Sequence, residues 1–138
     1  MWKYEKLMSE YDFLEFEELS NFPSSQDGYI CGNKIYIKDS LTPQQKHEIL
    51  AEEIAHYKIT YGNILDQTNF NNRKFEGYAR RQAYKMLMPI NEIKELHRNN
   101  ITTLHDIATH FEVTEQFVKS ALSYYVKKDI IPGAILSM

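Results

Sequence analysis

The chain has 138 residues, 43% of them hydrophobic and 25% charged, which is the composition of one globular domain with a modest core. A net charge of −3 gives no global reason to expect nucleic-acid or anionic-membrane binding. A single cysteine excludes an intramolecular disulfide framework and a cysteine-rich zinc cluster. The N-terminal segment lacks the apolar stretch of a secretory signal, and no apolar run is long enough to span a bilayer. We therefore expect a cytoplasmic protein with no membrane partner.

The first third of the chain predicts a helix, a loop and a hairpin. Hydrophobic residues near a 3.6-residue period predict a helix over residues 2–19, although the pattern is looser after Tyr11. Residues 21–28 have the composition of a loop. Two short β-rich runs then flank Gly32-Asn33, which predicts a tight hairpin.

A well-marked helix follows. Thr42 can cap it, Pro43 suits the first helical position, and Gln45 completes a capping box with Thr42. Gly62 supplies a plausible end. The apolar residues recur at intervals of three and four and predict a buried stripe made of Leu50, Ile54, Tyr57 and Tyr61.

The rest of the chain is helical in pattern. A second long helix is predicted from about Arg73 to Met88, ended by Pro89. Its apolar face consists of Phe75, Ala79, Ala83, Met86 and Leu87. Thr103 and Thr114 are predicted caps of two later helices. We predict a small α+β domain, in which a short β-sheet packs on helices. Residues 1–138 are expected to form one domain, with a core at about 1–90 and a helical extension at about 91–138.

The stretch AEEIAHY (51–57) is the candidate for chemistry. Glu52 and His56 are four residues apart on one helix, so their side chains are neighbours. Zinc peptidases of the H-E-x-x-H type place two ligands at this spacing, with a glutamate between them as general base. Here Glu52 and His56 would be the ligands and Glu53 the base, because a carboxylate is an accepted zinc ligand. The simpler alternative is an acidic, solvated helix face.

A third ligand is needed, and Glu76 on the second long helix is the candidate. The alternative for Glu76 is an ordinary surface carboxylate, and Asp66 is a weaker candidate ligand. His47 precedes Glu48 as a literal H-E pair, but it lies nine residues before His56. It should therefore lie on the opposite side of the helix, where we expect it to face solvent. The other histidines, His97, His105 and His110, are expected to be surface or packing residues.

These features together resemble the ImmA/IrrE family of metallopeptidases. The second helix of the family reads roughly E-x-x-A-x-x-F-A-x-x-L-L-x-P. This sequence matches that pattern at Glu76, Ala79, Ala83, Leu87 and Pro89, and it departs from it at Gln82 and Met86. The segment ILAEEIAHY (49–57) is similar to a branch of the family with E-E in place of H-E. The resemblance covers most of residues 25–125.

The resemblance implies a zincin-like fold and a metal-dependent endopeptidase. Glu52, His56 and Glu76 would bind a divalent metal, and Glu53 would be the catalytic base. Zinc is the expected metal, with manganese as the alternative, because two carboxylates favour a harder ion. Two negative ligands would also weaken the pull of the metal on bound water, so we expect a weaker or narrower peptidase. The implied substrate is a cytoplasmic protein, typically the helix-turn-helix repressor of a phage or mobile element.

Two rival functions remain open. The first is a pseudo-peptidase that binds a repressor or toxin partner without cutting it. The second is DNA binding, because residues 102–122 have the rhythm of a helix-turn-helix. The second helix of that segment begins with Glu115 and has one lysine, Lys119, before its middle, so direct DNA binding is disfavoured. Arg80 and Arg81 are expected to be solvated, with substrate contact as the alternative.

Overall fold

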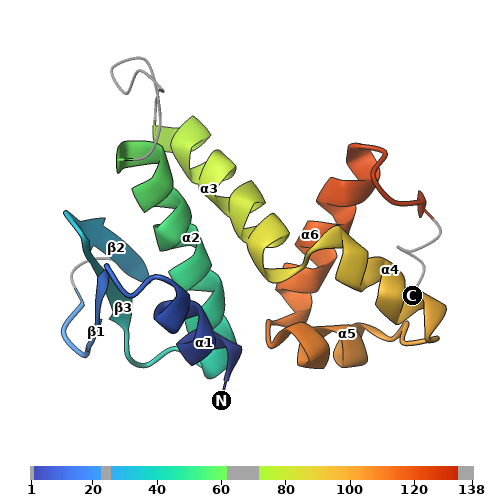
Figure 1. The fold of residues 1–138 in the computed structure, drawn as a ribbon, viewed down its shortest axis with the longest axis horizontal. Helices are drawn as coiled ribbons and strands as arrows, with labels where there is room; N and C mark the ends of the chain where they lie inside the picture. The colour runs from blue at the N-terminus through green and yellow to red at the C-terminus, as the bar shows by residue number, and fades with distance from the viewer. Residues whose placement is uncertain (1, 23–25, 62–71, 134–138) are drawn as a thin grey trace.

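The computed structural model describes residues 2–22, 26–61 and 72–133, and only the backbone of residues 60–61 and 72–75. Three strands and a helix occupy the N-terminal part, and helices make up the rest (Figure 1). In chain order the elements are α1 (Lys3–Glu10), β1 (Glu15–Leu19), β2 (Gly28–Cys31), β3 (Lys34–Lys38), α2 (Pro43–Tyr61), α3 (Asn72–Leu87), α4 (Ile90–Arg98), α5 (Leu104–Phe111) and α6 (Glu115–Lys127). The predicted small α+β fold is confirmed.

The sheet has the order β1-β3-β2, so β3 is central and β2 is an edge strand. The predicted hairpin is confirmed, because β2 and β3 pair antiparallel. Gly32 in its turn has a φ of +63°, a value that favours glycine. On β3, Ile35 and Ile37 alternate with partly exposed residues and are almost fully buried. One face of the sheet therefore packs into the core, against α2.

The predicted helix over residues 2–19 is wrong in its second half. The helix α1 ends at Glu10, and residues 15–19 form β1, which pairs in parallel with β3. The spacing of Phe13, Leu14, Phe16 and Leu19 fits a helix only loosely. What decides the conformation is the partner strand, since Phe16 lies opposite Ile35 in the sheet. Pairing between distant segments leaves little trace in a local pattern.

The start and the buried face of α2 are as predicted. The Thr42 hydroxyl accepts from the Gln45 amide at 3.1 Å, and the Gln45 side chain accepts from the Thr42 amide at 3.0 Å. Leu50 and Ile54 are fully buried and Tyr57 is half-buried. The side chain of Tyr61 and the predicted helix end at Gly62 lie outside the described residues.

Helices α2 and α3 pack closely side by side (Figure 1). Ala79 and Ala83 on α3 have no exposed surface, and small side chains allow two helix backbones to approach each other. The helix ends at Leu87, two residues before Pro89, close to its predicted end. The side chain of Phe75 lies outside the described residues. This close packing brings the candidate residues of the two helices together.

The C-terminal helices share the core of the N-terminal part. The Thr103 and Thr114 hydroxyls accept from the Asp106 and Phe117 amides, so both predicted caps are confirmed. The Tyr125 hydroxyl donates to the Met88 carbonyl at 3.0 Å in the interior. One hydrophobic cluster extends from α1 to α6, whereas the expected division near residue 90 stays a prediction. Of the helices described, none is both long and apolar enough to cross a bilayer.

Candidate active site

Two of the candidate side chains on α2 lie inside the protein. Glu53 is 5% exposed and His56 is 9% exposed. A solvated acidic face is therefore the wrong interpretation for these two residues. Ionisable groups are rarely buried without a partner, and this burial calls for specific contacts.

His56 contacts a carboxylate through each of its ring nitrogens. Its Nδ1 lies 3.3 Å from Glu53 Oε1 on the same helix. Its Nε2 lies 3.5 Å from Glu76 Oε1, which comes from α3. The structure therefore brings together three of the four predicted site residues. Glu76 itself stays open to solvent, with 58% of its side chain exposed.

Glu53 is enclosed between α2 and the edge strand β2. A Cβ atom added at Gly28 would lie 3.4 Å from Glu53 Cγ and only 2.4 Å from Ile49 Cγ2. Glycine at this position therefore lets the edge strand approach the helix. Among the described residues, Glu53 Oε2 is buried and has no hydrogen-bond partner. A buried carboxylate oxygen in this state is available to accept a proton from a bound water or substrate.

Glu52 points to a different partner. Its Oε1 lies 3.7 Å from Nε of Arg80 on α3. Burial raises the pKa of Glu52 to about 7; Arg80 acts against this, whereas Glu53 and Glu76 add to it. Arg80 therefore stabilises the charged form of a carboxylate that would otherwise tend to stay protonated.

The three glutamates also act on His56. Burial alone would lower the pKa of its imidazole, but the contact with Glu53 and the charges of Glu76 and Glu52 outweigh burial and raise the pKa. The carboxylates thus make the ring easier to protonate than a free imidazole. A divalent cation at the same place would satisfy the same carboxylates.

The fit of a metal can be tested on the donor geometry. Two ligands of one tetrahedral zinc lie roughly 3.4 Å apart, since each is about 2.0–2.2 Å from the ion. His56 Nε2 and Glu76 Oε1, at 3.5 Å, match this separation. Within residues 2–22, 26–61 and 72–133, however, no three His, Cys, Asp or Glu side chains are arranged to hold an ion. The pair therefore fits a metal, but Glu52 does not complete the group while it contacts Arg80.

The expectation that His47 faces solvent is wrong. His47 is 3% exposed, and its Nδ1 lies 2.9 Å from the carbonyl oxygen of Glu112. Glu48, the next residue, accepts from the Thr114 amide at 2.6 Å. Through these hydrogen bonds, His47 and Glu48 connect the start of α2 to the α5–α6 turn (residues 112–114). The sequence placed His47 on the side of the helix opposite His56, and the last third of the chain covers His47 there.

The remaining sequence candidates lie apart from the cluster. His97, His105 and His110 are exposed, as expected, and His105 and His110 lie 3.8 Å from Glu115 and 3.9 Å from Glu92. Asp66 lies outside the described residues. The role of Arg80 as the partner of Glu52 was missed, although Arg80 follows Glu76 by one helical turn. That spacing was the available signal, because residues four apart on α3 face the same side.

A buried glutamate and a histidine on α2, with a second carboxylate from α3, form an arrangement typical of metal-dependent peptidases. The model of the IrrE N-terminal-like domain, a peptidase family, matches residues 13–123. A search of curated proteins found no match. Because the family match covers most of the chain, the protein belongs to the ImmA/IrrE family of metallopeptidases. The resemblance noted in the sequence is thus confirmed, while the individual roles of Glu52, Glu53, His56 and Glu76 stay predictions.

Proposed function

We propose that this protein is a metal-dependent endopeptidase acting on a cytoplasmic protein, the helix-turn-helix repressor of a phage or mobile element. The observation that carries the proposal is the cluster of Glu53, His56 and Glu76, where a buried histidine contacts carboxylates from two helices. Family membership supports the peptidase class. The repressor as substrate rests on the family resemblance alone.

Glu52, His56 and Glu76 would hold the metal, with zinc expected and manganese as the alternative. The bound ion would polarise a peptide carbonyl and make a water molecule more acidic. For Glu52 to join the other two, its carboxylate must turn away from Arg80 Nε. Because the Arg80 side chain is exposed, it can move into solvent without disturbing the core.

Glu53 would act as the general base. Its Oε2 would take a proton from the attacking water, whose oxygen bonds to the carbonyl carbon of the scissile peptide. The same carboxyl group would then return the proton to the departing amide nitrogen as the C–N bond breaks.

The edge strand β2 offers a place for the substrate. Among the described residues it is paired with β3 on one side only, and it begins beside Glu53. An extended peptide can add to such an edge through main-chain hydrogen bonds. Docking there would bring a substrate backbone near the carboxylate.

The test compares the metal-loaded protein with Glu53→Gln, which removes the base and keeps the proposed ligands. Both are incubated with a lysate of cells carrying a mobile element, and new protein N-termini are identified by mass spectrometry. We expect cleavage by the unmodified protein, reduced about 100- to 10,000-fold in Glu53→Gln. Glu95→Gln on α4, an equal chemical change at an exposed residue, should cleave normally. Metal content should be equal in all three proteins.

A binding-only function is the second candidate, because in this structure Glu52 contacts Arg80 and no complete ligand group is formed among the described residues. In that case neither zinc nor manganese would produce new N-termini. Glu53→Gln would then derepress the target genes in cells as well as the unmodified protein does. That pair of results would refute the peptidase.

A further inference from the structure

A cleft of about 610 Å³ lies between α3 and α6. It is lined by four residues of α3 between positions 77 and 84 and six residues of α6 between positions 116 and 127, and these two helices diverge toward the top of Figure 1. Its size falls within the range of about 300–1,000 Å³ that is usual for ligand pockets. At its base, the ring of Tyr84 packs at 5.3 Å from Phe117 and 5.8 Å from Tyr124. Aromatic contacts therefore fix the two helices where the cleft closes.

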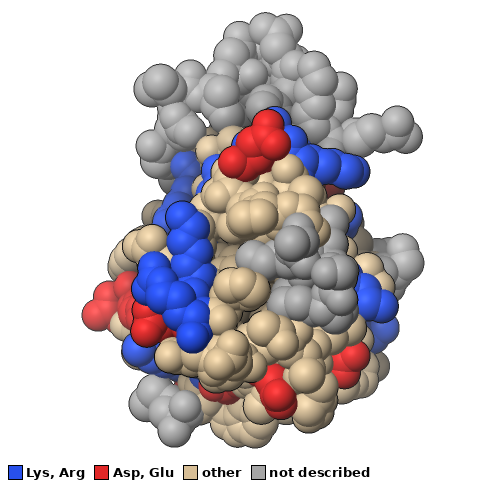
Figure 2. Space-filling view, turned by 90° about the vertical axis from the view of Figure 1, so that its right-hand side faces the viewer, with Lys and Arg blue, Asp and Glu red and all other residues tan. Residues whose placement is uncertain are grey.

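The cleft is strongly basic. It contains Arg80, Arg81, Lys119 and Lys127, and none of the described residues that line it is Asp or Glu. The protein as a whole has a net charge of −3, so the cleft gathers positive charge on a molecule that is negative overall. Lys and Arg side chains also gather in patches, rather than evenly, on the side of the molecule where α4–α6 lie (Figure 2). Such a site attracts anionic groups.

Neutral donors accompany the charges. Gln116, Ser120 and Ser123 lie on the same side of α6 as Lys119 and also line the cleft. Hydroxyl and amide groups can donate to carboxylates, which have two oxygens to satisfy. A ligand carboxylate would therefore find both a positive charge and hydrogen-bond donors.

The cleft adjoins the candidate active site. Arg80 lines the cleft, and its Nε also contacts Glu52 at 3.7 Å. Gly77, at the same end of the cleft, directly follows Glu76 in α3. A chain bound along the cleft would thus extend toward the cluster of Glu53, His56 and Glu76.

We propose that the α3–α6 cleft binds an acidic segment of the protein substrate and so holds the substrate beside the active site. The inference rests on the proposed function in one respect, namely that the substrate is a protein. The charge, the donors and the position of the cleft each favour this occupant. Binding itself can occur whether or not the bound protein is then cut.

Duplex DNA is a poorer match for the same cations. Glu115 stands at the N-terminal end of α6, where a recognition helix would meet the bases, and it is exposed. A long polyanion would also meet the net negative charge of the whole molecule, whereas a short acidic peptide would meet mainly the cleft. An acidic segment is therefore the occupant that the charges favour.

The experiment measures binding of a fluorescent Glu-rich octapeptide to the full chain by anisotropy at low salt. The test variant is Lys119→Glu with Lys127→Glu. The matched control is Lys85→Glu with Lys94→Glu, two exposed lysines outside the cleft, which changes the net charge equally. We expect about tenfold weaker binding in the test variant, and a change of less than about twofold in the control. If the charge reversal prevents folding, Lys119→Ala with Lys127→Ala replaces it as the test variant.

Three outcomes would overturn the proposal: no binding of the octapeptide, equal weakening in both double variants, or displacement of the peptide by duplex DNA at lower concentration than by unlabelled peptide. Glu53→Gln separates this proposal from peptidase activity, because it should bind the octapeptide normally. Binding without any cleavage of lysate proteins would refute the peptidase and leave the acidic-segment site intact. Cleavage that is unaffected by the Lys119→Glu and Lys127→Glu changes would refute the substrate-docking role.

Discussion

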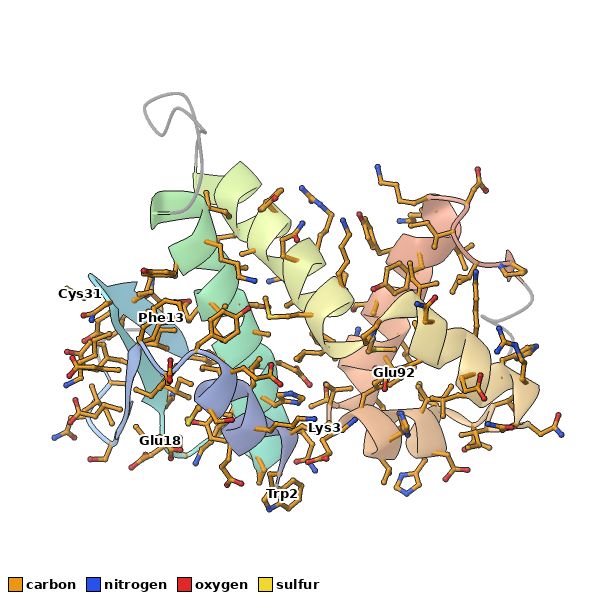
Figure 3. The ribbon with its side chains drawn as sticks, viewed as in Figure 1. Trp2, Lys3, Phe13, Glu18, Cys31 and Glu92 are labelled. Atoms are coloured by element: carbon orange, nitrogen blue, oxygen red, sulfur yellow. The ribbon has the colours of Figure 1, made fainter. Side chains whose placement is uncertain are left out.

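His47 shows how one buried side chain can join two parts of the chain. Its imidazole bonds to the Glu112 carbonyl oxygen, and Glu112 has a φ of 55°, in the left-handed region. The Glu112 side chain in turn accepts from the Lys3 amide at 3.1 Å. The first turns of α1 and α2 therefore both hold the α5–α6 turn, near Trp2 and Lys3 in Figure 3.

We predict that His47→Ala lowers the free energy of unfolding by roughly 2–3 kcal/mol at pH 8, because the half-buried Glu112 carbonyl loses its partner and a cavity remains where the buried imidazole was. Urea denaturation followed by circular dichroism measures this change. His105→Ala, which alters an exposed histidine, should leave the free energy of unfolding within about 0.5 kcal/mol. A loss of stability as small as that of the control would show that the bond to Glu112 is not important.

The same side chain predicts a pH dependence. Burial lowers the pKa of His47 below its ordinary value of 6.5, and the nearby Lys3 lowers it further, against the effect of the Glu112 carbonyl. The unfolded chain therefore takes up the proton first as the pH falls, which favours unfolding. The stabilisation from His47 is complete above pH 6.5 and declines below it. The difference in unfolding free energy between the unmodified protein and His47→Ala should accordingly narrow between pH 8 and pH 5.

At the scale of single residues, the sequence was better at indicating which side chains to consider than at predicting which groups surround them. The sequence pointed to Glu53, His56 and Glu76, which the structure brings together, whereas Glu52 contacts Arg80. The burial of His47 and the contact between Glu52 and Arg80 depend on which elements cover α2. Contacts between elements that are distant in the sequence leave no periodic signal in it.

At the scale of the elements, the contact between β2 and α2 sets the shape of the site. Strand and helix lie close together at Gly28, where an added Cβ would meet both Ile49 Cγ2 at 2.4 Å and the Tyr36 carbonyl oxygen at 3.2 Å. Tyr36 is in the central strand β3, whose backbone cannot easily move to make room for the added Cβ atom. A larger residue would therefore push the edge strand away from Glu53.

Gly28→Ala should lower the free energy of unfolding by about 1–3 kcal/mol through this overlap. It should also reduce the proposed peptidase activity in the lysate assay, because the edge strand would no longer lie against Glu53, the proposed base. The control is Gly133→Ala, where the added Cβ would only touch Val126 at 4.0 Å. Equal stability of the two variants in thermal denaturation would contradict the close packing.

The hairpin and the start of α2 could be predicted because their signals are local. Gly32-Asn33 and the Thr42–Gln45 capping box lie within a few residues of the structures that they define. Strand β1 could not be predicted, because its conformation depends on β3 and not on its neighbours in sequence. Its loosely spaced apolar residues fit a helix and a strand equally well.

On the scale of the whole molecule, one hydrophobic cluster and the bonds of His47 and Glu48 connect the sheet side with the helical side. Such continuity favours unfolding in a single cooperative step. Trp2, the only tryptophan, lines a second cleft together with residues of the α5–α6 turn. The fluorescence of Trp2 therefore reports on the contact between the N-terminus and the α5–α6 turn, whereas circular dichroism reports on all helices.

We predict that both signals have the same midpoint in urea. Glu48→Ala, which removes the acceptor of the Thr114 amide, should lower both midpoints together, with a loss of about 1.5–3 kcal/mol. Glu95→Ala on α4 is the control and should leave both unchanged. Separate midpoints for the two signals would mean that the helical extension unfolds on its own.

The parallel pairing of β1 with β3 sets an order of events during synthesis. The β2–β3 hairpin closes over two residues, whereas β1 must wait for a strand made later in the chain. At roughly 5–20 residues per second, about a second or more separates the two strands. Glu15, Glu17 and Glu18 give β1 three exposed negative charges, which discourage pairing with other chains. The acidic strand is thus suited to remaining unpaired on the ribosome until β3 emerges.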